Sequence, residues 1–225
     1  MHVVSYDKQT ISNPNPLARF AHKARYAQSV RLIDQVTPKG GALLDFGAGL
    51  GGTLDAVARQ RPDIRRNAVE PFMPFKSEGS TLYADLADAP SRSMDVITSF
   101  EVIEHMQEID ILKFVRDAAA ACKTNGIVVI SVPIMIGVAI PMKMLNHAVL
   151  YRRAPEYSLP EITRAMFGIS PTRPANVAHS HKGFDFRRVP TFFSSHFEVG
   201  KQFSGPLMGM PWWLNSQAYF YFRPV

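Results

Sequence analysis

The sequence predicts an α/β fold with a doubly wound, seven-stranded and mostly parallel sheet that has an antiparallel edge. Short apolar runs alternate with longer amphipathic ones between residues 16 and 133, which is the pattern of strand–helix units. A glycine-rich turn follows the first apolar run, as in many parallel sheets. Two further strand-like segments lie at the C-terminal end and predict the antiparallel edge.

The elements follow in order along the chain. An amphipathic helix over 16–36 ends at the TPKGG turn, because glycine and proline stop a helix, and the first strand covers 42–46. The remaining predicted elements are a helix at 52–60, strands at 66–70, 80–85 and 94–100, one or two helices within 101–123, a fifth strand at 126–133 after a TNG turn, a helix or interrupted helix at 184–196, and closing strands at 197–204 and 217–224.

Residues 133–182 are the least regular part of the sequence and are rich in proline, methionine and aromatic residues. Open parallel sheets bind ligands beyond the carboxyl ends of their strands, so a segment after the fifth strand is well placed to form a substrate lid. We therefore expect one domain over 1–225, with a cofactor-binding half at 16–132, a lid insertion at 133–182, and a closing helix and strands at 183–225.

Composition predicts a cytoplasmic protein. Cys122 is the only cysteine, so no internal disulfide forms, and the polar start of the chain predicts no secretory signal. The most apolar segment, 127–142, is shorter than a membrane-spanning helix and contains two prolines. The net charge of +6 is local: residues 143–201 hold nine Lys or Arg against four Asp or Glu.

The stretch LLDFGAGLGGTL, residues 43–54, fits two ligand-binding turns. Gly47, Gly49 and Gly52 have the GxGxxG spacing of a Rossmann-like turn that binds dinucleotides, whereas Gly47, Gly49 and Gly51 have the GxGxG spacing of a turn that binds S-adenosylmethionine. The glycines alone do not separate these ligands, because each only lets the backbone approach a ligand or a helix closely.

Asp45 separates the two ligands. A dinucleotide places its pyrophosphate over this turn, where an adjacent carboxylate would repel it. S-adenosylmethionine has no phosphate and carries a sulfonium and an ammonium group that a carboxylate attracts. Glu70, at the end of the second strand, suits either ligand because it can accept hydrogen bonds from both ribose hydroxyls. The sequence therefore favours S-adenosylmethionine over NAD.

Five motifs follow one another along residues 41–133: LLDFGAGLGGTL, AVEPF, YADL, MDVITSFEVIEHM and TNGIVVISVP. In their order and spacing they resemble the class I S-adenosylmethionine-dependent methyltransferases. The similarity is greatest to the small-molecule branch that includes the O-methyltransferases of ubiquinone biosynthesis.

The resemblance implies a role for individual residues. Asp45, Gly47 and Gly49 would line the methionine part of the cofactor, Glu70 would bind the ribose, and Asp85 with Leu86 would meet the adenine. Phe100 would border the cofactor, and Arg25 would meet its carboxylate. The complete predicted cofactor set is Arg25, Asp45, Gly47, Ala48, Gly49, Glu70, Pro71, Asp85, Leu86 and Phe100.

The EVIEH string predicts Glu101, Glu104 and His105 on one face of a helix at the mouth of the sheet. Such a triplet suits a divalent ion, and some ubiquinone-pathway relatives use it so, but the charge of the two glutamates also stabilises a helix N-terminus. We expect no metal here and activity without a divalent ion. His105 is a candidate general base, as are His179 and His181 from the lid, since a pKa near 6.5 suits that work.

The expected activity is methyl transfer to a small acceptor that is amphipathic or anionic, with oxygen as the expected methylated atom. Apolar residues and then arginines follow residue 133, which suits such an acceptor or a peripheral contact with an anionic membrane. DNA is not an expected partner, because the [DN]PP[YF] signature is missing after the fourth strand. An RNA methyltransferase and a non-catalytic scaffold with this fold are the alternatives. The oligomeric state is not predicted.

Overall fold

The computed structural model describes residues 16–151, 156–178 and 180–225. One seven-stranded sheet crosses the described part of the chain, in the order β3-β2-β1-β4-β5-β7-β6. The five strands β1 to β5 run parallel, and β7 pairs antiparallel with both β5 and β6. The predicted fold class is confirmed. The strands are β1 Ala42–Phe46, β2 Arg65–Val69, β3 Thr81–Tyr83, β4 Met94–Phe100, β5 Cys122–Pro133, β6 Phe197–Gly205 and β7 Gln217–Pro224.

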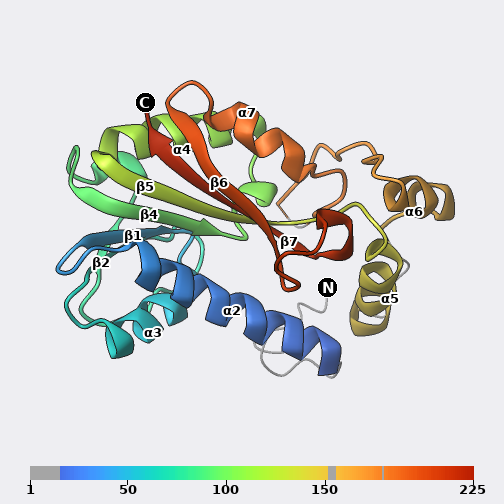
Figure 1. Cartoon of the computed structure of the whole chain (residues 1–225), viewed down its shortest axis with the longest axis horizontal. Coiled ribbons are helices and arrows are strands. Elements are labelled where there is room, and N and C mark those ends of the chain that lie inside the picture. The colour runs from blue at the N-terminus through green and yellow to red at the C-terminus, as the bar shows by residue number, and fades with distance from the viewer. Residues whose placement is uncertain (1–15, 152–155, 179) are drawn as a thin grey trace.

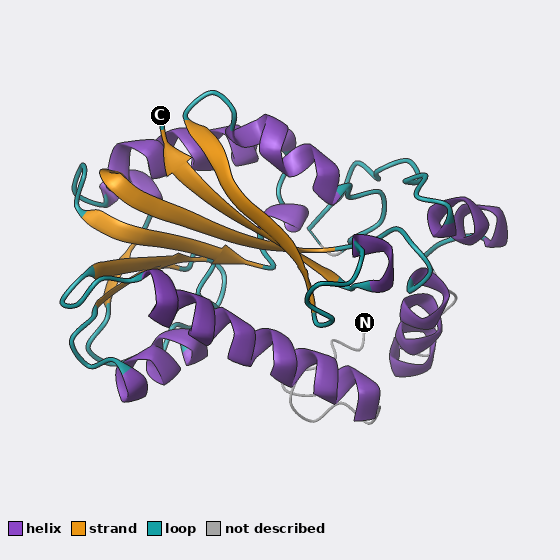
Figure 2. Cartoon of the chain, in the orientation of Figure 1, coloured by secondary structure: helices purple, strands orange, loops and turns teal. Residues whose placement is uncertain are grey.

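Helices cover both faces of the sheet and its carboxyl edge. Figures 1 and 2 show α2 and α3 on one face, α4 and α7 on the other, and α5 and α6 beyond the ends of β4 and β5. Every helix in the described ranges is too short or too polar to cross a membrane. The helices are α2 Pro16–Val36, α3 Gly52–Gln60, α4 Glu108–Ala121, α5 Ile140–Tyr151, α6 Leu159–Met166 and α7 Val189–Phe193.

Strand alternation assigns neighbouring residues to two cores. Leu43 packs in the core under α2 and α3, whereas Leu44 packs in the larger core under α4 and α7. The same alternation separates Val129 from Val128 and Ile130 on β5. Because both faces of the sheet are covered, β1 is apolar except for Asp45, and β5 is apolar except for Ser131 from Ile127 onward. Their carboxyl ends meet at the edge where the glycine turn and the end of β4 lie.

Three sequence expectations about the elements are wrong. The third strand is shorter than 80–85, and the predicted TNG turn lies inside β5, where the pairing with β4 shifts register. Residues 133–182 contain two helices, α5 and α6, and α6 begins with a reciprocal cap between Ser158 and Glu161. Ile140, Met144 and Ala165 also belong to the larger core, so the segment packs against the domain more than an irregular sequence suggested.

Candidate active site

The glycine turn that follows β1 has a left-handed backbone conformation, which residues other than glycine rarely adopt. Gly47 has φ 74°, and a Cβ there would lie 2.4 Å from Cγ2 of Val102. Gly49 has φ 59° and opens on free space, since the nearest atom to an added Cβ is Sδ of Met73 at 3.9 Å. The amides of Gly47 and Ala48 donate to the carbonyl of Val69. The turn therefore exposes main chain to a ligand at the carboxyl edge.

Asp45 lies at this edge with 4% of its surface exposed. Oγ1 of Thr98 donates to its carboxylate at 2.6 Å. Burial raises the pKa of Asp45 to about 7, against the opposing hydrogen bond from Thr98, and the nearby charge of Glu70 adds to the rise. The binding of a cationic ligand group by this carboxyl group stays a prediction.

Glu70 binds the turn in addition to any ribose. One carboxylate oxygen accepts from the amide of Gly49 at 2.7 Å, and the other accepts from the amides of Phe72 and Met73. These bonds join the glycine turn to the segment after β2. The sequence predicted only a ribose-binding carboxylate here, and the structure adds that Glu70 orders the main chain around the expected ribose position. Pro71, beside it, is exposed.

The predicted adenine neighbours, Asp85 and Leu86, and the predicted cofactor neighbour Phe100 lie in different surroundings. Asp85 accepts two contacts from Nζ of Lys113, at 2.7 and 2.8 Å, and one from the amide of Ala87, and these donors lower its pKa. The Leu86 side chain is 1% exposed and lies in the larger core, so only its main chain can border a ligand. Phe100, at the end of β4, is partly buried against the core under α2.

Arg25 pairs with Glu101 across the carboxyl edge. Nη1 of Arg25 donates to Oε2 of Glu101 at 2.9 Å, and Nε2 of Gln217 donates to Oε1. Glu101 has φ 60°, which is uncommon for a residue with a side chain and is frequent at functional sites. The expectation that Glu101 shares a helical face with Glu104 and His105 is wrong, because only Ile103–His105 form a short 3₁₀ helix.

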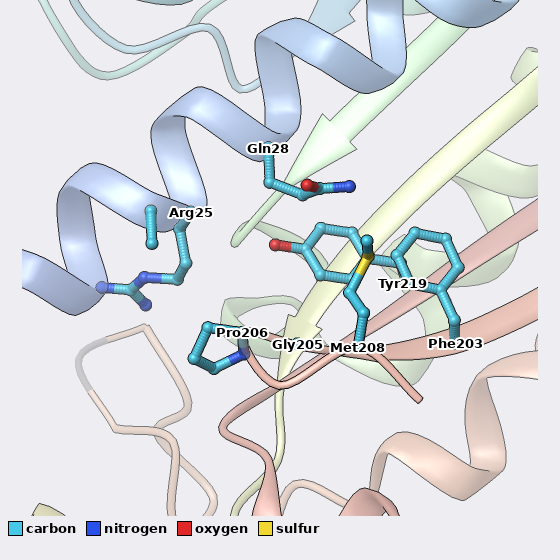
Figure 3. A pocket seen from close by; sticks show the side chains of 8 residues that line it. Arg25, Gln28, Phe203, Gly205, Pro206, Met208 and Tyr219 are labelled. Carbon is cyan, nitrogen blue, oxygen red and sulfur yellow. The ribbon is translucent and has the colours of Figure 1, made fainter. Parts of the chain in front are cut away.

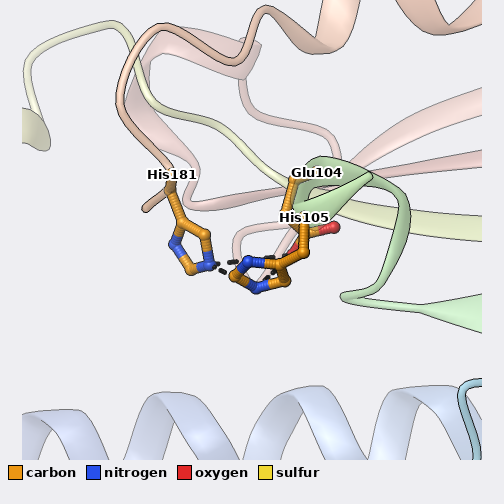
Figure 4. A group of neighbouring side chains, drawn as sticks. All are labelled: Glu104, His105 and His181. Atoms are coloured by element: carbon orange, nitrogen blue, oxygen red, sulfur yellow. Dashed lines mark hydrogen bonds and ion pairs between the residues drawn. The ribbon is translucent and has the colours of Figure 1, made fainter. Parts of the chain in front are cut away.

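A different trio forms next to this edge. His105 comes from the 3₁₀ turn after β4 and His181 from the second half of the chain, and their Nε2 atoms are 2.9 Å apart. Glu104 is fully buried, with Oε1 3.9 Å from each of those Nε2 atoms. Figure 4 shows the three side chains converging from the two segments. The predicted base candidates are thus brought together, whereas His179 lies outside the described residues.

Basic residues of the second half mostly bind neighbours within the chain. Nη2 of Arg173 donates to the carbonyls of Glu104 at 2.8 Å and Met106 at 3.0 Å, which anchors the second half to the turn after β4. Nζ of Lys182 binds Glu161 at 2.9 Å. Nζ of Lys143 donates to two carbonyls at the ends of β5 and β7, and burial lowers its pKa to about 8.

A small cavity opens between α2 and the hairpin of β6 and β7 (Figure 3). Its walls include Arg25, Gln28, Met208 and the pair Phe203 and Tyr219, whose rings stack with centroids 4.9 Å apart. Figure 3 shows the hydroxyl of Tyr219 directed toward α2. The cavity has a volume of about 100 Å³, below the roughly 300 Å³ of a typical ligand site. An acceptor of ordinary size enters it only if the hairpin or α2 moves.

A sequence profile of the methyltransferase domain matches residues 18–166 of the chain. The chain belongs to the methyltransferase domain family. This methyltransferase uses S-adenosylmethionine, and the open glycine turn with a buried carboxylate at its base fits a cofactor that carries positive charge and no phosphate. No curated protein sequence matches the methyltransferase.

Solved structures share the fold of the methyltransferase at low identity. The PH0226 protein of Pyrococcus horikoshii has a TM-score of 0.65 at 10% identity, with 98% of this chain and 96% of that one covered. A putative sarcosine dimethylglycine methyltransferase of Galdieria sulphuraria has a TM-score of 0.57 at 14% identity, with 92% and 87% covered. The 1,6-didemethyltoxoflavin-N1-methyltransferase of Burkholderia thailandensis, with S-adenosylhomocysteine bound, has a TM-score of 0.59 at 14% identity, with 92% and 80% covered.

Two features of the site escaped sequence reasoning. Gln217 holds Glu101 from a strand more than a hundred residues later, and Arg173 binds main-chain carbonyls instead of facing an anionic acceptor. Neither contact has a local signal, because both depend on antiparallel pairing and loop packing. His181 was predicted as a base candidate, but its contact with Glu104 was not.

Proposed function

We propose that the methyltransferase transfers a methyl group to an oxygen atom of a small amphipathic or anionic acceptor. The observation that carries the proposal is the imidazole pair, His105 and His181, next to the end of β4 where the cofactor site begins. When bound, S-adenosylmethionine supplies an activated methyl group, so the chain has to position the acceptor and accept one proton. Oxygen acceptors need that proton removed.

The imidazole pair suits this proton transfer. With Nε2 atoms 2.9 Å apart, one ring donates to the other, so a proton taken by one imidazole is shared with its neighbour. The carboxyl group of Glu104 is fully buried beside the pair, with Oε1 3.9 Å from Nε2 of each ring. Both histidine side chains are about one-third exposed, so an acceptor can reach them.

The cavity beside α2 supports the acceptor class. Stacked aromatic rings and Met208 offer an apolar wall, and Arg25 brings a positive charge to the same cavity. An aromatic or aliphatic body with an anionic group would match both. Arg25 is paired with Glu101 here, so an acceptor anion or the cofactor carboxylate would compete with that glutamate.

The test is turnover with a panel of phenols, hydroxy acids and amines. We expect His105→Asn and His181→Asn to lower kcat by roughly 100-fold at neutral pH, the range for losing a general base. His196→Asn, an exposed histidine before β6, is the matched control and should keep full activity. Methylation of amines alone, or unchanged kcat in both variants, would contradict the proposal.

A second candidate is a partner-binding scaffold without turnover. Glu101 in its left-handed conformation favours catalysis over a scaffold, because such strain is retained where a site requires it. Cofactor binding with no turnover on any acceptor class, including RNA, would favour the scaffold.

A further inference from the structure

We infer that Glu104, His105 and His181 form a binding site for a divalent transition metal of the zinc class. The site differs from the triplet that the sequence suggested. Glu101 is excluded because both of its carboxylate oxygens are engaged by Arg25 and Gln217. His181 replaces it, 76 residues beyond His105 along the chain.

The geometry of the donor atoms fits a small cation. Oε1 of Glu104 lies 3.9 Å from each Nε2, and the two Nε2 atoms lie 2.9 Å apart. One point about 2.1 Å from all three atoms satisfies these separations, and that is the length of zinc bonds to imidazole nitrogen and carboxylate oxygen. The three donors therefore need little rearrangement to bind one ion.

The buried carboxylate gives an independent reason for a cation. Glu104 has no exposed surface, and its two side-chain oxygens accept no hydrogen bond among the described residues. A buried carboxylate without donors is destabilising by several kcal/mol unless a proton or a cation neutralises it. Arg173 is close, but its guanidinium donates to the main-chain carbonyls of Glu104 and Met106 instead of the carboxylate.

The donor set selects the class of ion. Two imidazole nitrogens with one carboxylate oxygen favour zinc and its transition-metal neighbours, whereas magnesium and calcium prefer oxygen ligands throughout. Three protein donors leave a further position for water, as in zinc sites that remain open. The bound ion would also fix His181 of the second half to the turn after β4.

Metal binding and the proposed base function use the same two imidazole rings. A zinc ion on both Nε2 atoms would replace the hydrogen bond between the rings and make both rings poorer bases, so zinc would slow oxygen methylation and a chelator would leave it intact. That consequence rests on the proposed function. The metal site itself does not, because its test needs no acceptor and its failure leaves the proposed function standing.

The experiment is titration of the metal-free full chain with zinc chloride, in competition with a chromophoric chelator. We expect one zinc ion per chain, and an affinity roughly 100-fold lower in Glu104→Gln and in His181→Asn. His196→Asn is the matched control and should bind as the unmodified chain does. Magnesium should not compete. S-adenosylhomocysteine binding by each variant shows that the variant is folded.

The absorption spectrum of bound Co²⁺ provides a second readout, which depends on direct ligation by His181 and not on a purely structural role of that residue. Bound at this site, Co²⁺ should give visible absorption bands of a low-coordinate ion, and these should vanish in His181→Asn. Absence of stoichiometric zinc binding overturns the inference. So does equal affinity in the control and the two ligand variants, or loss of binding only in His196→Asn.

Discussion

The two halves of the chain encode their structure in different ways. In the first half, up to Pro133, the predicted cofactor site is formed by residues that are close in sequence or on adjacent strands. Asp45 and Gly49 lie four residues apart, and Glu70 directly follows the adjacent strand β2. In the second half the main contacts join residues that are far apart in sequence, such as Arg173 and the turn after β4. Substitutions in the first half should therefore change cofactor affinity. Substitutions in the second half should change acceptor binding and the free energy of unfolding, but not cofactor affinity.

The largest expected effect comes from Asp45→Asn. In the folded chain the pKa of Asp45 is about 7, raised from 3.8, so the folded state holds a proton that the unfolded state loses. Stability of the ligand-free chain should fall as pH rises from about 4 to about 7 and then level off. Removing this carboxyl should raise the free energy of unfolding near pH 8 by up to about 4 kcal/mol.

The same variant should lose cofactor affinity, which denaturant unfolding and calorimetry on one sample can show together. Only the ionised carboxylate attracts the cofactor's positive charge, so affinity in the unmodified chain should fall about fivefold between pH 7 and pH 6, and less steeply in Asp45→Asn. If Asp45→Asn changes neither the free energy of unfolding nor cofactor affinity, burial of the Asp45 carboxylate does not destabilise the fold and the carboxylate does not bind the cofactor.

Gly47→Ala should have the next largest effect. The residue needs a left-handed backbone and an added Cβ overlaps Val102, so the free energy of unfolding should fall by about 3 kcal/mol. Gly40→Ala is the matched control, since Gly40 has φ 68° but free space around it, and should cost only about 1 kcal/mol. Chemical denaturation measures both. Equal losses would mean that Val102 yields to the methyl group.

Glu70→Ala should weaken S-adenosylhomocysteine binding by about 1.5 to 3 kcal/mol, the range for losing charge-assisted hydrogen bonds. The structure adds that three amide donors lose their acceptor, so the turn loses order as well. Glu70→Gln separates the two effects because its carbonyl oxygen still accepts from an amide. Calorimetry is the measurement, and an unchanged dissociation constant in both variants would assign Glu70 no part in binding.

The smallest effect on the cofactor should come from the second half. Arg173→Met removes two hydrogen bonds to carbonyls and should lower the free energy of unfolding by about 1 to 2 kcal/mol while leaving S-adenosylhomocysteine affinity unchanged. Arg164→Met, at an exposed helix position, is the control and should leave both unchanged. A large loss of cofactor affinity in Arg173→Met would contradict the assignment of cofactor binding to the first half alone.

Sequence reasoning succeeded where structure is local. The period of apolar residues predicted β1, α3, β4 and the closing antiparallel pair, because each element is amphipathic or buried within its own length. The turn glycines and Asp45 were predicted for the same reason. Their roles in binding the cofactor remain predictions.

Sequence reasoning failed where a residue depends on a distant partner. Glu101 was placed on a helix by its spacing from Glu104, yet its contacts with Arg25 and Gln217 accompany a left-handed backbone that spacing does not encode. Within 133–182, helix α6 was missed because Ala165 is its one buried residue, which leaves no repeated apolar spacing to detect. Helix α5 was missed although Ile140 and Met144, four residues apart, both belong to the larger core. Whether this segment is the most mobile part of the chain and moves as a lid stays a prediction, which hydrogen exchange with and without an acceptor would test.

The central claim is that Asp45 and the glycine turn form a site for a positively charged cofactor without phosphate. Its most direct test is a calorimetric titration of the full chain near pH 8 with S-adenosylmethionine, S-adenosylhomocysteine, NAD and NADP. We predict binding of the first two with one site per chain, weakened in Asp45→Asn, and no binding of the dinucleotides. Tight binding of NAD or NADP without binding of S-adenosylhomocysteine would contradict the account.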